Sequence, residues 1–104
     1  MIRTSLLYPH KEGARFDFDY YFNKHLPFVK KSLGDAMKHL SVDKGIAGAG
    51  PDAPPPFLVS AFMTFESVEA FQNAFGPHAT AIFADIPNFT DVQPVATISE
   101  IVYE

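Results

Sequence analysis

The sequence contains no cysteine among its 104 residues. This absence excludes a disulfide framework, a thiol nucleophile and a thiolate metal site. Basic residues are also few, because eight Lys and Arg stand against twelve Asp and Glu, for a formal net charge of −4. Only Lys30 and Lys31 are adjacent. We therefore predict neither nucleic-acid binding nor attachment to an anionic membrane, since both need a basic patch.

Long hydrophobic runs are missing as well. No run approaches the roughly 18 apolar residues of a membrane span, and the apolar run at the N-terminus is too short for a signal peptide. We expect a soluble, cytoplasmic protein in which residues 1–104 form a single domain. The four histidines are widely spaced and have no carboxylate at ligand spacing, so no metal site is predicted.

Apolar residues, by contrast, are plentiful. They make up 47% of the chain, including 11 Phe, while charged residues make up 19% against a usual value of about 25%. A small monomer cannot easily bury so much apolar material, so the composition favours a homodimer. The alternative is that the Gly- and Pro-rich stretch 46–56, or the C-terminus, folds across an apolar face of the same chain.

The hydrophobic periodicity predicts alternating strands and helices in the order βαββαβ. This order is the ferredoxin-like α+β plan, a four-stranded antiparallel sheet with strands one and three in its centre and the helices on one face. Two such sheets packed face to face would form a dimeric α/β barrel. The predicted strands are 2–8, 36–44, 57–65 and 92–103, and the predicted helices are 18–33, 68–75 with Ser67 as its cap, and 78–85.

The helix over 18–33 carries the clearest local signals. Asp17 can accept a backbone N–H as its N-cap, and Gly34 is a typical C-terminal stop. Pro27 lies inside the helix and should bend it, because it removes one backbone hydrogen bond. The core stripe is predicted to be Phe18, Phe22, Leu26, Val29 and Leu33.

His25 is the best candidate for a catalytic residue. It lies beside the predicted core stripe, with Tyr21 one helical turn before it, and a neutral imidazole can transfer protons near neutral pH. The alternative is a buried histidine bonded to a backbone carbonyl, with Tyr21 as packing. A substrate pocket next to His25 is predicted to be walled by Phe22, Phe28, Phe62 and Phe83, with His39 as a further candidate on the mixed side of the second strand.

Several segments resemble the EthD family of dimeric α/β-barrel proteins. They are Tyr8-Pro9, Phe16-Asp17, Tyr20–Val29, Thr64–Phe71 and Val95–Ile98. Within them, the pattern Tyr-Tyr-x-x-x-His-x-Pro at Tyr20–Pro27 is the most specific. The resemblance covers essentially the whole chain and marks His25 as the family's usual candidate for the site.

The resemblance implies a small dimeric protein that acts on a small apolar organic molecule in degradation or secondary metabolism. EthD-like proteins are commonly labelled reductases or oxidoreductases, and relatives of the same barrel class include isomerases, cyclases and cofactor-free monooxygenases. No residue pattern for nicotinamide or flavin is present, so we predict no cofactor. The alternatives are a dimer that binds the molecule without catalysis, and a protein that binds haem through His25.

Overall fold

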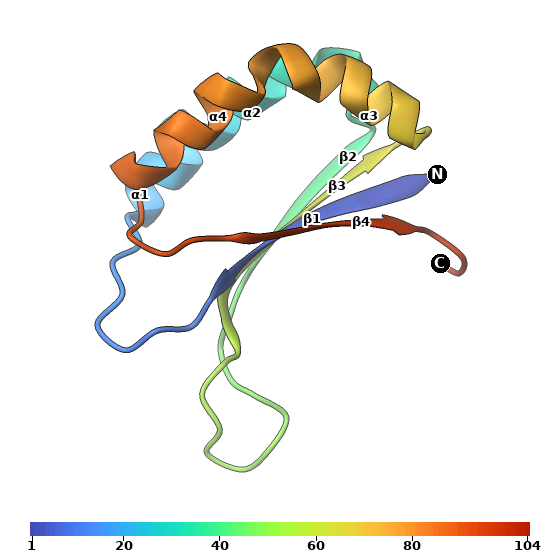
Figure 1. Cartoon of the computed structure of the whole chain (residues 1–104). Coiled ribbons are helices and arrows are strands. Elements are labelled where there is room, and N and C mark those ends of the chain that lie inside the picture. Colours follow the sequence, from blue (N-terminus) through green and yellow to red (C-terminus); the bar gives the residue numbers. More distant parts are fainter.

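The computed structural model describes all 104 residues and has the predicted α+β plan (Figure 1). A four-stranded antiparallel sheet lies under a single layer of helices. The strands are β1 (Ile2–Pro9), β2 (His39–Lys44), β3 (Phe57–Phe65) and β4 (Val95–Glu100). The α-helices are α1 (Phe18–Tyr20), α2 (Leu26–Leu33), α3 (Val68–Phe75) and α4 (Ala79–Asp85), with 3-10 turns at Gly34–Ala36, Gly76–His78 and Ile86–Asn88.

The sheet has the order β2-β3-β1-β4, so β1 and β3 are central, as predicted. Thr4 of β1 pairs with Met63 of β3 and with Ile98 of β4. Because side chains alternate along a strand, Thr4, Leu6 and Tyr8 all point toward the helices. The register shifts at the end of β1, where Pro9 pairs with Phe57 and skips Leu58.

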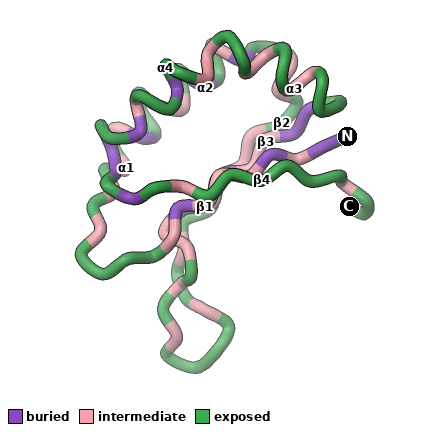
Figure 2. Tube along the Cα trace, in the orientation of Figure 1, coloured by how far each residue is buried: buried purple, intermediate pink, exposed green.

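Two strands are shorter than predicted. β2 begins at His39 because the chain leaves α2 through the 3-10 turn Gly34–Ala36. β4 begins only after Pro94, which cannot donate a ladder hydrogen bond, and it ends at Glu100 because its partner β1 begins at Ile2. β4 is therefore a short edge strand, and all six of its residues are exposed (Figure 2).

The first helical region begins and ends as the sequence predicts. The Asp17 carboxylate accepts the Tyr20 N–H at 3.1 Å, and Gly34 takes a positive φ of 56° at the end of α2. Between α1 and α2 the segment Tyr21–His25 is a π-helix, in which the Leu26 N–H donates to the Tyr21 carbonyl five residues back. Pro27 explains this widened turn, because its ring would clash with the carbonyl four residues before it.

Two clusters of buried side chains join the helices to the sheet. The first contains Tyr8, Tyr21, Val59, Ile86, Phe89 and Val92, and the second contains Ile2, Val29, Leu33, Phe65 and Ile82. The clusters lie toward opposite ends of β1, since Tyr8 belongs to one and Ile2 to the other. Between them, the helices arch away from the sheet (Figure 1).

The face of the sheet opposite the helices is uncovered in one chain (Figure 1). A shallow groove on it is lined by Arg3, His39, Ser41, Phe62 and Thr64, so this face mixes apolar and polar side chains. The 45–56 segment projects from the sheet as a loop between β2 and β3 and does not fold across this face. None of the helices combines the length and the apolar character needed to span a bilayer.

Candidate active site

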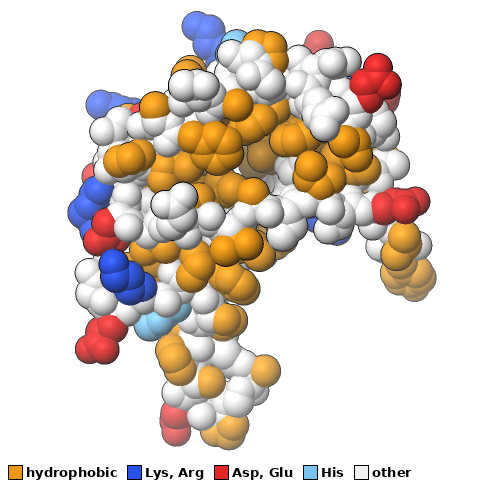
Figure 3. Space-filling model, in the orientation of Figure 1, with side chains coloured by type: hydrophobic (Ala, Val, Ile, Leu, Met, Phe, Trp, Pro, Cys, Tyr) orange, Lys and Arg blue, Asp and Glu red, His pale blue; other side chains and the backbone are white.

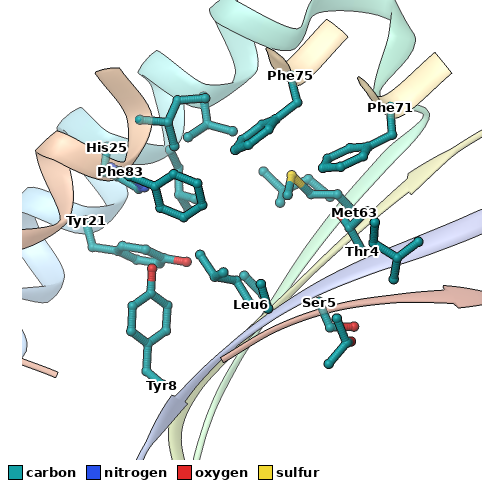
Figure 4. Close-up of a pocket in the computed structure, with 18 residues that line it drawn as sticks. Thr4, Ser5, Leu6, Tyr8, Tyr21, His25, Met63, Phe71, Phe75 and Phe83 are labelled. Atoms are coloured by element: carbon teal, nitrogen blue, oxygen red, sulfur yellow. The ribbon is translucent and has the colours of Figure 1, made fainter. Parts of the chain in front are cut away.

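A cavity of about 240 Å³ lies between the helices and the sheet, where the two buried clusters leave space. Fourteen of its 18 lining residues are hydrophobic, so its walls are largely apolar. Apolar side chains gather around a hollow at this position in the space-filling view (Figure 3). The apolar wall includes Leu6, Met63, Phe71, Phe75, Ile82 and Phe83 (Figure 4).

His25 reaches this cavity from the π-helical segment. Its side chain is buried, and its ring packs against those of Tyr21 and Phe89, with centroid distances of 5.6 and 4.6 Å. Nδ1 lies 2.8 Å from Oδ2 of Asp85. Because an ionised carboxylate only accepts hydrogen bonds, Nδ1 carries the proton and Nε2 keeps its lone pair. Nε2 makes no hydrogen bond within the chain and is available to a molecule in the cavity.

Asp85 stands at the end of α4 and is held by more than the histidine. Its Oδ1 accepts a hydrogen bond from the Tyr20 hydroxyl at 2.5 Å and another from the Asn88 amide at 2.9 Å. These contacts lie on the outer side of the helical layer, in a shallow depression lined by Tyr20, Lys24, Phe28, Asp85 and Asn88. His25 therefore connects a fixed carboxylate near the surface to the inside of the cavity.

The electrostatics favour a neutral histidine beside an ionised carboxylate. Burial lowers the pKa of His25, and the hydrogen bond and charge of Asp85 only partly oppose this shift. Burial alone would raise the pKa of Asp85, but the hydrogen bonds from Tyr20, Asn88 and His25 together lower it. At neutral pH the pair is thus poised as a base, with a free lone pair at Nε2.

Two phenols stand close to His25 in the cavity. The rings of Tyr8 and Tyr21 meet edge to face at 6.4 Å, and their hydroxyl ends converge in Figure 4. Burial raises the pKa of both phenols, and for Tyr8 the proximity of Tyr21 adds to the rise. Both groups therefore remain protonated and can donate hydrogen bonds over the whole physiological range.

Three of the predicted site residues lie at the cavity, and the other four lie elsewhere on the protein. His25 and Tyr21 lie together in the cavity, with Phe83 in its wall. Phe22 and Phe28 are on the exposed side of their helix, and Phe28 faces the outer depression instead. Phe62 and His39 line the groove on the opposite face of the sheet.

The residues that lie outside the cavity were misplaced for physical reasons. The widened π turn changes the phase of the helix, so Tyr21 and His25 face the cavity and Phe22 faces outward. In β3, Phe62 alternates with Ala61 and Met63, which face the helices. The aromatic wall is built instead from Phe71 and Phe75 of α3, together with Phe83.

Sequence reasoning missed Asp85, Tyr20, Tyr8 and Thr4. Asp85 lies 60 residues from His25 in the chain, and no spacing rule relates the two positions. Tyr20 lies on the outer side of its helix, and its contact with Asp85 depends on how α4 packs there. The alternation in 2–8 could have placed Thr4 and Tyr8 on one face, beside Leu6.

Comparison with known proteins identifies the family. The EthD domain profile matches residues 12–93. The chain belongs to the EthD family. It is similar to an EthD-like protein from Ralstonia eutropha JMP134, with 44% identity, coverage of 99% of this chain and 93% of that one, and a TM-score of 0.93.

Two further structures are similar over nearly the whole chain. An EthD family protein from Bacillus halodurans C-125 is 26% identical, with coverage of 96% and 97% and a TM-score of 0.73. A dimeric ferredoxin-like protein of unknown function from Thermobifida fusca YX is 14% identical, with coverage of 96% and 90% and a TM-score of 0.59, which shows the shared fold. No curated protein matches this EthD chain.

The cavity also limits the groups that this EthD protein could hold. No three His, Asp or Glu side chains come close enough together to bind a metal ion. His25 alone could act as an axial ligand of haem, but the volume of about 240 Å³ is small for a macrocycle of four pyrrole rings, since a single benzene fills a cavity of about 150 Å³.

Proposed function

We propose that this protein binds a small apolar carbonyl compound and transfers a proton at the carbon next to the carbonyl group. The observation that carries this proposal is the His25–Asp85 pair, which presents a free Nε2 lone pair to an apolar cavity. A base that is fixed in this way can act without any cofactor. The activity would be of the isomerase or cyclase type. It involves no net oxidation and therefore differs from the oxidoreductase activity with which proteins of this family are commonly labelled.

The chemical step uses groups that the cavity already contains. Nε2 of His25 removes the proton, so a C–H bond breaks, an N–H bond forms, and the electron pair moves to the carbonyl oxygen. The Tyr21 hydroxyl donates a hydrogen bond to that oxygen as its charge develops. The Asp85 carboxylate stabilises the imidazolium through Nδ1. In a β,γ-unsaturated ketone, return of the proton to the γ carbon completes an isomerisation. Attack of the enolate carbon on a second carbonyl of the same molecule closes a ring, and the new alkoxide then takes the proton back from Nε2.

The test is hydrogen–deuterium exchange of 2-tetralone, a two-ring ketone, followed by NMR in deuterated buffer. The wild-type protein should speed the exchange above the buffer rate. The protein-dependent exchange rate should be at least 100-fold lower in H25A than in wild type, since a general base usually contributes about 10²–10⁴. H10A is the matched control, because His10 is exposed in the loop after β1 and does not line the cavity. It should exchange like wild type.

The results separate catalysis from simple binding. Exchange that is equally fast in H25A and wild type would refute the role of His25. Binding of the ketone by the wild-type protein without any exchange would show instead that the chain is a non-catalytic binding protein.

We also propose that two copies pair through the uncovered face of the sheet and form a dimeric α/β barrel. Leu7 and Phe62 lie on this face, and the edge strand β4 leaves Val95 half-exposed beside them. The Thermobifida fusca protein of the same fold is described as dimeric. Light scattering should give twice the chain mass of 11.5 kDa. F62K should shift the mass toward one chain, while F28K, on the outer helical surface, should not.

A further inference from the structure

Two buried hydroxyl groups in the cavity have no hydrogen-bond partner. They are Oγ1 of Thr4 and the hydroxyl of Tyr8, and their side chains are 5% and 0% exposed. Nearly all buried polar groups in proteins are paired, because leaving one unpaired costs free energy. Both residues line the cavity, but the two oxygens themselves are almost fully covered in the ligand-free chain, so a ligand that pairs with them must first displace the side chains around them. Two orphans beside the same cavity therefore indicate hydrogen bonds that the chain reserves for a ligand.

The two hydroxyls belong to different ends of the cavity. Thr4 and Tyr8 are four residues apart on the helical face of β1, which separates their Cα atoms by roughly 13 Å. Leu6 lies between them (Figure 4). Thr4 is flanked across the sheet by the apolar residues Met63 and Ile98. Tyr8 lies at the end where Tyr21 and His25 stand.

The charges around the cavity restrict the ligand further. No Lys, Arg, Asp or Glu lines it, and its ionisable side chains are Tyr8, Tyr21 and His25. Both phenols stay protonated and His25 stays neutral, since burial shifts each pKa in that direction. A carboxylate or phosphate ligand would thus be buried without a counter-charge, which is strongly unfavourable.

The volume sets the size of the ligand. A benzene molecule fills a cavity of about 150 Å³, and this cavity holds about 240 Å³. The space therefore corresponds to about two fused six-membered rings. The aromatic side chains of Phe71, Phe75 and Phe83 on one side, with Leu6 and Met63 on the other, suit a flat apolar body.

We infer that the ligand is an uncharged two-ring compound with an oxygen at each end, one held by Tyr8 and Tyr21 and the other by Thr4. This inference rests on the proposed function and adds its substrate class. The oxygen at the tyrosine end is the carbonyl whose neighbouring carbon His25 deprotonates. The oxygen at the Thr4 end is a hydroxyl or carbonyl that fixes how deeply the molecule enters.

The experiment compares three probes by calorimetric titration: 2-tetralone, 6-hydroxy-2-tetralone and 2-naphthoate. The hydroxylated ketone should bind about tenfold more tightly than 2-tetralone, as one additional hydrogen bond of ordinary strength provides. The charged 2-naphthoate should bind at least tenfold more weakly than 2-tetralone. Equal binding of 2-naphthoate and 2-tetralone, or no binding of either ketone, would overturn the inference.

Variants assign the two ends. T4V keeps the shape of the side chain and should abolish the tenfold advantage of the 6-hydroxyl group, with 2-tetralone unaffected. Y8F should weaken both ketones by about tenfold. T80V is the control, because Thr80 is exposed on α4 and does not line the cavity, and it should leave all affinities unchanged.

The inference and the proposed function fail in different ways. If T4V preserves the advantage of the 6-hydroxyl group, the two-ended ligand is refuted, while the loss of exchange in H25A can still support proton transfer. If the affinities follow the expected pattern but the wild-type protein does not speed exchange, the ligand class is supported and proton transfer is refuted.

Discussion

Removing either orphan hydroxyl should make the ligand-free protein more stable. A buried hydroxyl that has no partner costs about 1–3 kcal/mol of folding free energy, because it gives up its hydrogen bonds to water on folding. Thr4→Val and Tyr8→Phe each delete one such hydroxyl and preserve the shape of the side chain. Each should therefore raise the free energy of unfolding by about 1 kcal/mol, the low end of that range.

The gain should be visible in thermal unfolding. For a domain of about 100 residues, 1 kcal/mol corresponds to a rise of about 4 °C or more in Tm. Circular dichroism at a fixed protein concentration measures this, and the fixed concentration matters if the chain dimerises. The two sites are far enough apart for their effects to add, so the double variant should gain about 2 kcal/mol. Thr80→Val, which changes a hydroxyl on the exposed surface of α4, should leave Tm within about 2 °C of wild type.

A fall in Tm for both single variants would refute this reasoning. It would show that both hydroxyls are hydrogen-bonded in the folded protein and pay no burial penalty. An unchanged Tm in both would equally contradict the calculated gain. A rise in Tm combined with weaker binding of 6-hydroxy-2-tetralone is the expected pair of results for each variant, because groups kept for a ligand commonly cost stability.

Three further predictions concern the His25–Asp85 pair and the turn that carries it. Asp85→Asn should lower the maximal exchange rate. It should also move the acid limb of the pH–rate profile to lower pH, because Asp85 raises the pKa of His25. An acid limb that stays in place would contradict the contact between His25 and Asp85. Pro27→Ala should restore a backbone donor for the Asn23 carbonyl and so favour a regular α-helix. The proton exchange of the ketone should then slow down without a fall in Tm. Unchanged exchange would show that the π turn does not position His25. In an acid titration, stability should decrease as the pH drops below about 6.5, because His25 then binds a proton in the unfolded chain but stays neutral in the folded chain, where its pKa is lower. The loss of stability should be smaller in H25A, and an identical loss would contradict this assignment.

The fold could be predicted because its signals are local. The Asp17 cap, the Gly34 stop and the strand over 57–65 each depend on neighbouring residues, and each is found in the structure. The βαββαβ order then leaves few topologies, so the central positions of β1 and β3 followed.

The site could be predicted only in part, because its geometry is not local. His25 and Tyr21 stand one turn apart, so their association was readable from the sequence. The partner of His25 was not, since Asp85 reaches it only through the packing of α4 against α2. The π turn before Pro27 also shifts the helical phase, which no fixed period of 3.6 residues anticipates.

The two sides of the cavity differ in how firmly they are held, and this difference bears on specificity. Tyr8, Tyr21 and Phe89, which surround His25, all belong to one buried cluster and are fully or almost fully enclosed. Phe71 and Phe75 are only partly buried, and Phe83 is 44% exposed. The polar end is thus rigid, as the proposed proton transfer requires, while the aromatic wall has room to move. The protein should therefore discriminate strictly between ligands that differ at the carbonyl end. It should tolerate more variation in the shape of the ligand's apolar part, which lies against Phe83.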